Sequence, residues 1–231
     1  MTYVFPPQLI PSLAVFGEEA RFPVRRIFCV GRNYAAHARE MGKDPDREPP
    51  FFFTKPADAV VGDQEIVPYP PLTEDLHYEG ELVVAIEHGG SDISESEALN
   101  HVFGYAIGND LTRRDLQAEA KRLGRPWDWA KGFDHSAVCG PIHRAKQGDH
   151  LSGGRISSTV NGETRQDADL ADMIWSVPEI IAILSRSMRV FSGDLIYTGT
   201  PAGVGALTAG DVCTVTVEGL GSISTKIGSR D

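Results

Sequence analysis

Short apolar runs bounded by glycine or proline recur along the whole chain and limit what it can fold into. The run 25–30 (RRIFCV) stops at Gly31, and the aromatic run 51–53 lies between prolines. Runs this short and this rich in β-branched or aromatic residues are typical of strands. Asn161-Gly162, between two further runs, is a strong hairpin signal. We expect strands within 25–30, 49–56, 78–86, 101–112, 155–166, 193–205 and 211–228, the last of these being an antiparallel hairpin.

Four helices are expected between these strands, at 33–42, 94–102, 112–124 and 177–188. Ser94 and Glu97 have the spacing of a capping box, and Gly124 follows a Thr-capped helix as a stop signal. The strands outnumber the helices, and long alternating β–α–β units are missing. The sequence therefore predicts an α+β, mainly β fold with peripheral helices. Residues 1–24 are expected to be a short irregular extension and 25–231 a single domain.

The chain carries 22 basic and 32 acidic residues, so its formal net charge is 22 − 32 = −10. An acidic surface argues against nucleic acid or an anionic membrane as a partner, but a local basic cluster can still bind a small anion. Cys29, Cys139 and Cys213 lie far apart without a CxxC pair, which favours buried thiols in a reducing cytoplasm. The N-terminal stretch lacks the pattern of a signal peptide.

The segment 77–82 (HYEGEL) places Glu79 and Glu81 one residue apart at the start of an apolar run. On a strand these side chains share a face, with Cα atoms roughly 6–7 Å apart. Two explanations are open: a solvated strand end, or a cation held between the carboxylates. Asp110 at the end of another expected strand could add a third oxygen ligand. Carboxylates without cysteine or histidine are the ligand set of Mg²⁺ or Mn²⁺.

Three further features could carry chemistry. His37 and Glu40 are three apart on the expected helix 33–42, so the carboxylate could orient the imidazole as a general base; an exposed polar pair is the alternative. Lys131 follows two tryptophans and either snorkels over Trp129 or meets an anion inside a site. The glycine-rich loop 197–205 permits close approach of a ligand, but it is not a phosphate-binding loop.

Six motifs together resemble the fumarylacetoacetate hydrolase family, in its order and with its spacing. They are VGRNYAAHARE, FFFTKPADAV, HYEGELVVAI, GNDLTRRDLQ, WAKGFDHS and YTGTPAGVG. The resemblance runs from about Arg25 to the C-terminus and is closest to the family's short bacterial fumarylpyruvate hydrolases and acylpyruvases. It implies a mixed β-sandwich roll, assembled as a homodimer, in which 25–231 is the catalytic domain.

The resemblance also implies roles for particular residues. Mg²⁺ or Mn²⁺ would be held by Glu79, Glu81 and Asp110. His37 and Glu40 would activate water from a helix that acts as a mobile lid, and Lys131 would be a catalytic lysine. The residues implied to bind substrate are Lys55, Arg114, Gln117 and Thr200.

The activity implied is hydrolysis of a carbon–carbon bond in a 2,4-dioxo acid, with fumarylpyruvate as the expected substrate in cytoplasmic gentisate or salicylate breakdown. The distal carboxylate of a fumaryl group needs a cation, and Arg113, Lys121 and Arg125 are all candidates. Alternatives are an oxaloacetate decarboxylase or a decarboxylase/isomerase of homoprotocatechuate ring-fission products, which need no attacking water. A further alternative, outside the enzymes, is a non-catalytic binding protein that has kept the metal pocket.

Overall fold

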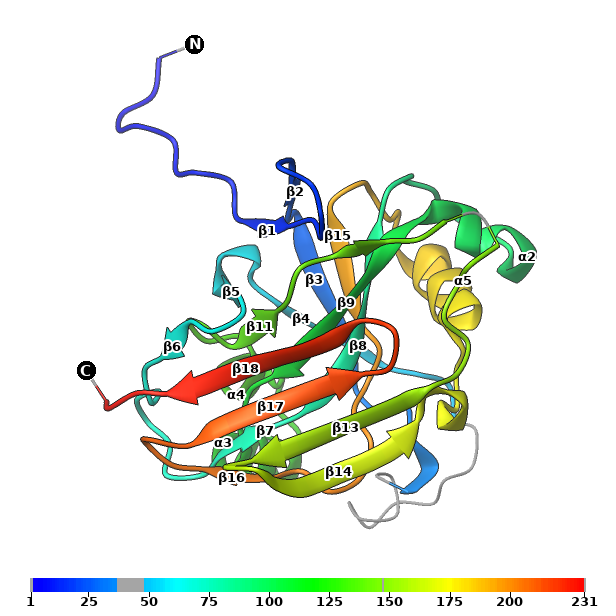
Figure 1. Ribbon diagram of the computed structural model, residues 1–231. Coiled ribbons are helices and arrows are strands. Elements are labelled where there is room, and N and C mark those ends of the chain that lie inside the picture. Colours follow the sequence, from blue (N-terminus) through cyan, green and yellow to red (C-terminus); the bar gives the residue numbers. More distant parts are fainter. Residues whose placement is uncertain (1, 37–47, 147, 231) are drawn as a thin grey trace.

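A computed structural model describes residues 2–36, 48–146 and 148–230 of the protein. These residues form three β-sheets and a small hairpin, with short helices at the periphery (Figure 1). The prediction of a mainly β fold with peripheral helices is confirmed.

A curled eight-stranded sheet forms the centre of the molecule. Its strands are, in order, β4 (Phe52–Lys55), β3 (Arg26–Val30), β15 (Asp194–Tyr197), β8 (Gly80–Ile86), β9 (Val102–Asp110), β11 (Ala137–Cys139) and β5 (Val60–Val61), with β12 (His143–Arg144) also paired to β9. Strand β8 runs antiparallel to both of its neighbours, β15 and β9. The end of β9 therefore meets the start of β8.

A five-stranded sheet packs against one face of this central sheet (Figure 1). Its order is β14 (Glu163–Asp169), β13 (Arg155–Val160), β17 (Val212–Val217), β18 (Gly221–Ile227) and β6 (Ile66–Val67). The turn between β13 and β14 uses Asn161 and Gly162, whose φ angles are 52° and 84°. This turn and the antiparallel pairing of β17 with β18 confirm both predicted hairpins.

Two smaller sheets complete the strands. One has the order β10 (Thr112–Arg113), β7 (Leu76–Tyr78) and β16 (Gly205–Leu207), and the other pairs β1 (Ser12–Ala14) with β2 (Arg21–Pro23). The segment predicted to be an irregular N-terminal extension thus contains a hairpin. Its Leu13 is buried in one apolar cluster with Val83 of β8, whereas Leu82 of β8 packs in another cluster with Val215. Because both faces of the central sheet are covered, the part of β8 that follows Glu81 is an unbroken apolar run.

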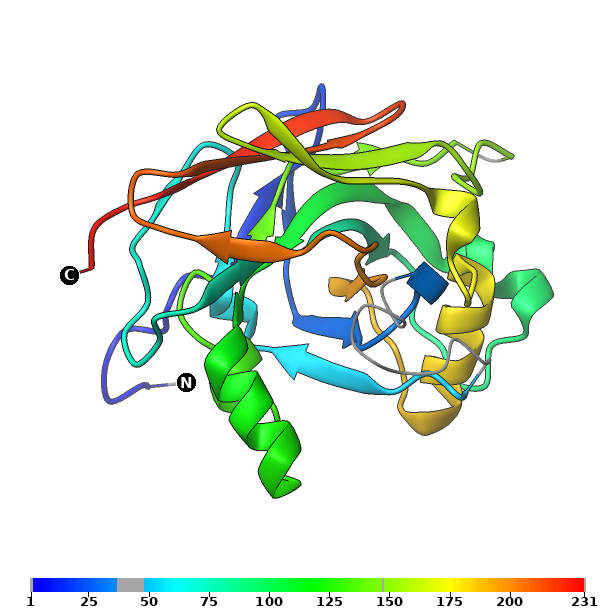
Figure 2. The ribbon, with the colours of Figure 1, turned by 90° about the horizontal axis from the view of Figure 1, so that it is seen from below.

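The helices are α2 (Glu95–Ala98), α3 (Arg114–Leu123), α4 (Asp128–Lys131) and α5 (Val177–Ser187), with 3₁₀ turns at Ala57–Ala59, Leu99–His101 and Leu170–Asp172. Figure 2 shows α3 and α5 well separated at the edge of the molecule. None of the helices in the described residues is long and apolar enough to cross a membrane. Cys29, Cys139 and Cys213 are buried and free, and burial raises the pKa of the Cys139 thiol to about 12.

Helix ends show where local sequence signals fail. Gly124 ends α3 in the left-handed conformation with φ 64°, as predicted. The predicted Thr cap of that helix is wrong, because Thr112 lies in β10 and its hydroxyl donates to the Asp110 carbonyl. The capping box predicted at Ser94 is also wrong. The Ser94 hydroxyl contacts Ser96, and the Glu97 carboxylate accepts from Asn100 instead.

Candidate active site

Three carboxylates converge where β8 and β9 meet. Glu81 lies in β8, Asp110 ends β9, and Glu79 occupies the break between β7 and β8. One oxygen from each lies within 4.8 Å of the others, and all three residues are buried. The Asp110 N–H donates to the Glu79 carbonyl at 2.9 Å, which fixes the two backbones against each other. Alternation along the strand brings Glu79 and Glu81 together, and antiparallel pairing adds Asp110.

Two buried lysines hold these carboxylates. Lys131 Nζ donates to Glu79 Oε2 at 2.7 Å and to Asp110 Oδ2 at 2.9 Å. Lys55 Nζ lies 2.8 Å from Asp110 Oδ1 and donates to the Leu111 carbonyl. The snorkelling alternative for Lys131 is wrong, because Trp129 is 74% exposed whereas Lys131 is buried.

The first turn of α3 brings a guanidinium to the same cluster. Arg114 Nη2 donates to Glu79 Oε1 at 2.6 Å, and Nη1 donates to Gln117 Oε1 at 2.7 Å. Residues three apart on a helix share a face, so Arg114 and Gln117 point the same way. Arg114 therefore orients Glu79 from the side opposite Lys131.

The loop after β15 fixes the third carboxylate. The Gly199 N–H donates to Glu81 Oε2 at 2.7 Å. The Thr200 hydroxyl donates to the Gly80 carbonyl at 2.9 Å and accepts from Gln166 Nε2 at 2.8 Å. The loop therefore positions Glu81 and Gly80 through backbone and hydroxyl groups, and the close approach of a ligand to it stays a prediction.

Gly199 supports a first prediction. Its φ is +98°, and an added Cβ would lie 2.7 Å from Asn33 Cβ. Gly199→Ala is expected to lower the free energy of unfolding by about 2–4 kcal/mol, since backbone strain and overpacking add. Gly210→Ala is the matched control, because Gly210 has the same φ of +98° with nothing within 4 Å. Equal losses for the two variants in urea unfolding would contradict the close contact at Gly199.

The charges of the cluster show whether a divalent cation fits. Burial, reinforced by the charges of Asp110 and Glu79, holds the pKa of Glu81 well above its usual range. Burial alone would lower the pKa of Lys131, but Asp110 and Glu79 outweigh it and the net shift is upward. Three buried carboxylates whose mutual repulsion is this strong, and which offer only hard oxygen ligands, fit Mg²⁺ or Mn²⁺.

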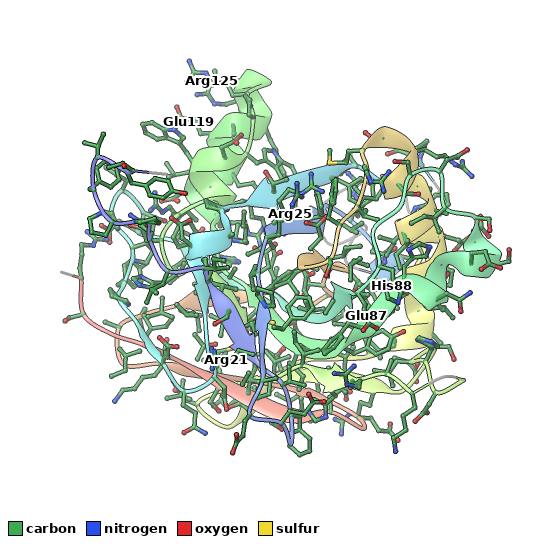
Figure 3. The ribbon with its side chains drawn as sticks, turned by 90° about the horizontal axis from the view of Figure 1, so that it is seen from above. Arg21, Arg25, Glu87, His88, Glu119 and Arg125 are labelled. Carbon is green, nitrogen blue, oxygen red and sulfur yellow. The ribbon has the colours of Figure 1, made fainter. Side chains whose placement is uncertain are left out.

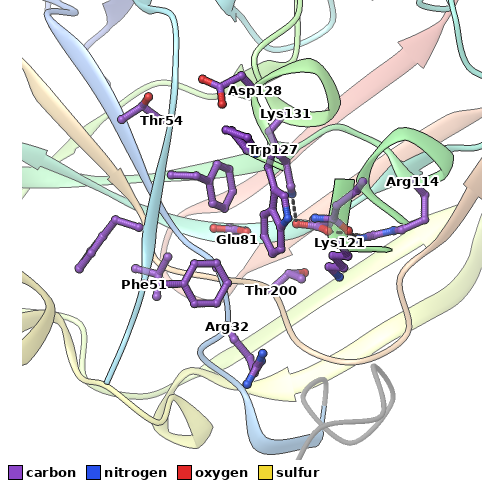
Figure 4. Close-up of a pocket in the computed structure, with 17 residues that line it drawn as sticks. Arg32, Phe51, Thr54, Glu81, Arg114, Lys121, Trp127, Asp128, Lys131 and Thr200 are labelled. Carbon is purple, nitrogen blue, oxygen red and sulfur yellow. Dashed lines mark hydrogen bonds and ion pairs between the residues drawn. The ribbon is translucent and has the colours of Figure 1, made fainter. Parts of the chain in front are cut away.

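Glu79 and Glu81 line the floor of a cavity of about 720 Å³, in which Figure 4 labels Glu81. Aromatic side chains form one wall, with the Trp127 ring centroid 5.2 Å from that of Phe51 and 5.8 Å from that of Phe53. Four cations line the same cavity: Arg32, Arg114, Lys121 and Lys131. An aromatic wall and a basic lining favour a flat, unsaturated anion as the ligand.

Most of the residues predicted for the site come together. Glu79, Glu81, Arg114, Gln117, Lys131 and Thr200 line the cavity. Asp110 and Lys55 are buried beneath this floor and are not among its lining residues. His37 and Glu40 lie outside the described residues.

Sequence reasoning missed Arg32 and Trp127 as lining residues. Arg32 comes two residues after β3, and a charged residue at the end of a buried strand was the available signal. Trp127 lies four residues before Lys131 in the segment already singled out.

Residues 26–228 match the family profile described as "Fumarylacetoacetate (FAA) hydrolase C-terminal".

The chain belongs to the fumarylacetoacetate hydrolase family.

Relatives in this family support an enzyme. A fumarylpyruvate hydrolase of a Ralstonia species is 46% identical over 193 residues, covering 83% of this chain and all of the relative. The oxaloacetate tautomerase YisK of Bacillus subtilis is 40% identical over 219 residues, covering 89% of this chain and 70% of the relative. The predicted class of hydrolase acting on carbon–carbon bonds is confirmed by the family and by the first of these relatives.

A solved structure of the family has the same fold. The crystal structure of fumarylpyruvate hydrolase from Pseudomonas aeruginosa, in complex with Mn²⁺ and pyruvate, superposes with a TM-score of 0.96. It is 49% identical and covers 99% of this chain and all of that one. The Mn²⁺ in that relative and the carboxylate triad of this chain together support a divalent metal site.

Proposed function

We propose that this protein hydrolyses a carbon–carbon bond of a 2,4-dioxo acid, with fumarylpyruvate as the lead substrate and Mg²⁺ or Mn²⁺ as the cofactor. The observation that carries the proposal is the buried triad of Glu79, Glu81 and Asp110 at the base of a cation-lined cavity. The relative that holds Mn²⁺ and pyruvate supports the same chemistry.

Charge balance supports a doubly anionic substrate. The three carboxylates of the triad are matched in number by three cations, Lys55, Arg114 and Lys131, which form ion pairs with Glu79 and Asp110. A divalent cation would add two positive charges to a cluster that is already balanced. A dicarboxylate restores neutrality in a buried site, where uncompensated charge is costly.

The metal ligands in this proposal are Glu79, Glu81 and Asp110. A divalent ion bound there would supply Lewis-acid stabilisation of negative charge on the substrate oxygens. Lys131 Nζ bridges Glu79 and Asp110 and keeps a positive charge next to the reacting atoms. Such preorganised positive charge favours a developing enolate. Phe51, Phe53 and Trp127 form an apolar wall beside this charge.

Water activation is assigned to His37 and Glu40 from the sequence. An imidazole nitrogen of His37, oriented by Glu40, takes a proton from water, and the hydroxide adds to the 4-oxo carbon of the substrate. The bond between that carbon and the pyruvyl carbon then breaks, and the electron pair stays with the pyruvyl enolate. The proton held by His37 passes to the enolate carbon and gives pyruvate, and the acyl half leaves as fumarate when its new carboxyl group ionises. One water is consumed and one proton is released, so atoms and charge balance.

Oxaloacetate tautomerisation is a second candidate, favoured by the tautomerase relative that is 40% identical. It needs only movement of a proton between carbon and oxygen at a stabilised enolate. The same cations at the same floor could serve it, and no attacking water is required.

The test uses the purified full-length protein with fumarylpyruvate and with enol-oxaloacetate, each with Mn²⁺ and with EDTA. We expect Mn²⁺-dependent loss of fumarylpyruvate with equimolar release of fumarate and pyruvate, and loss of turnover in EDTA. Turnover of enol-oxaloacetate alone would replace the hydrolase proposal with the tautomerase. Turnover that persists in EDTA would contradict a metal role for the triad.

A further inference from the structure

Two cations line the outer part of the cavity without contacting the triad. Lys121 Nζ lies 5.0 Å from the Trp127 ring centroid and forms no ion pair with any other residue in the described ranges. Arg32 Nη1 lies 3.3 Å from Glu48 Oε2, and the Glu48 side chain is 72% exposed. An ion pair this exposed contributes little, so Arg32 can exchange it for a ligand carboxylate at small cost.

The other two basic residues considered for an anion site do not face this cavity. The Arg113 guanidinium is buried 4.4 Å above the Phe133 ring, and Arg113 is not among the lining residues. Arg125 lines a separate surface hollow with Trp129, and Figure 3 shows it at the outer end of the α3 region. The structure therefore separates Lys121 from Arg113 and Arg125.

The path from the triad to Lys121 is lined by aromatic rings. Trp127 contacts Phe51 edge to face, and the Lys121 ammonium lies over the Trp127 ring (Figure 4). The Trp127 indole therefore lies between the apolar wall and the outer cation. A planar, conjugated chain can lie against this wall while one end reaches the metal site and the other end reaches Lys121. A cation next to an aromatic face is also partly desolvated, which strengthens its attraction for a carboxylate.

We propose that Lys121, assisted by Arg32, forms a second anion subsite that receives the carboxylate at the acyl end of the substrate. This subsite selects dicarboxylate acylpyruvates over those whose acyl group ends in a methyl. The inference deepens the proposed function and rests on it for the placement of the other end of the substrate at the triad.

The decisive measurement is kcat/KM for fumarylpyruvate and for acetylpyruvate, which lacks the distal carboxylate. Lys121→Met is expected to lower kcat/KM for fumarylpyruvate on the order of 10- to 100-fold, the worth of a charged hydrogen bond. Acetylpyruvate turnover should stay nearly unchanged. Lys121→Arg should restore preference for fumarylpyruvate. Arg122→Met, on the same helix but not lining the cavity, is the matched control and should change neither substrate.

The protonation state of Lys121 gives an independent readout. Lys121 remains in contact with solvent at the rim, yet partial desolvation, followed by the charge of Arg114, lowers its pKa to about 8. The other charges that act on it are Glu79, which opposes the shift, and Lys131 and Arg32, which add to it. Glu81, on β8, and Asp128, on α4, are the remaining acidic residues among those lining the cavity.

Because Lys121 loses its proton above that pKa, the ratio of kcat/KM for fumarylpyruvate to that for acetylpyruvate should fall as pH rises through about 8. A group that acts on both substrates changes both kcat/KM values by the same factor, so its titration does not affect this ratio. The ratio should become flat with pH in Lys121→Arg, since arginine stays charged.

A binding experiment keeps this inference separate from the proposed function. The Mn²⁺-loaded protein is titrated with fumarate and with crotonate, which differ only in the distal carboxylate. Tighter binding of fumarate that disappears in Lys121→Met supports the subsite even if neither acylpyruvate is cleaved. Equal losses on fumarylpyruvate and acetylpyruvate, or no difference between fumarate and crotonate in the wild-type protein, would overturn it.

Discussion

Replacing His37 with alanine is expected to lower kcat for fumarylpyruvate by roughly 10²- to 10⁴-fold, the usual worth of a general base. The Kd for Mn²⁺ should not change, because the described oxygen ligands are Glu79, Glu81 and Asp110. Steady-state kinetics at saturating Mn²⁺, together with calorimetric titration of the metal, separates the two effects. The reason for so large a loss is that Glu79 and Asp110 are engaged with cations, while Glu81 accepts from the Gly199 N–H and is assigned to the metal, so these three carboxylates are already committed to other roles.

His88→Ala is the matched control, since His88 is exposed and lies outside the cavity lining. It should leave kcat unchanged. Glu40→Gln should fall between the control and His37→Ala, because it removes the orienting charge but leaves the imidazole. Full activity of His37→Ala would show that His37 is not the general base, and it would favour a reaction without attacking water. Oxaloacetate tautomerisation, assayed on the same variant, would then be the reaction to pursue.

The carboxylate site could be predicted because two of its three carboxylates are only two positions apart in the sequence. Glu79 and Glu81 share a strand face, and their spacing alone raised the possibility of a cation. What sequence did not reveal is that Glu79 stands in a break between strands of two different sheets. That break lets the Glu79 N–H bond to the Asn109 side chain instead of continuing the ladder.

The cations around the triad illustrate the opposite case. Lys131 reaches Glu79 across 52 residues, and Lys55 reaches the Leu111 carbonyl across 56. No periodicity or spacing rule encodes such contacts, because they depend on how separate sheets and loops pack. Family resemblance supplied Lys131 and Lys55, but not that Lys55 lies behind Asp110 rather than in the cavity. We infer that Lys55 positions Asp110 and does not itself touch substrate.

The same reasoning explains why the cap signals failed. Thr112 and Ser94 are good caps by residue type. Tertiary structure placed Thr112 in β10, and side-chain pairing occupied Ser94 and Glu97. Local propensity is a weak prior wherever a stronger long-range arrangement uses the same groups.

Lys131→Met is expected to lower the free energy of unfolding by roughly 3–5 kcal/mol in EDTA, because it leaves a buried cluster of carboxylates with one cation fewer. The buried charges of Glu79 and Asp110 then lose their shared donor. Saturating Mn²⁺ should recover part of this loss by supplying positive charge to the same oxygens, while kcat stays low because Mn²⁺ does not replace the ammonium. Urea unfolding with EDTA and with Mn²⁺ measures both effects.

The pH dependence of that variant tests the electrostatic cause. Burial and the charges of Asp110 and Glu79 hold the folded-state pKa of Glu81 well above its usual range, and the charge of Lys131 opposes this shift, so removing Lys131 should raise that pKa further. The folded protein then binds more protons than the unfolded one, so the loss of stability should grow as pH rises from about 5 to 8. Lys226→Met, which removes an exposed lysine of β18, should show no such trend. A loss in Lys131→Met that is the same at every pH, and unaffected by Mn²⁺, would mean that Lys131 acts through packing and not through charge.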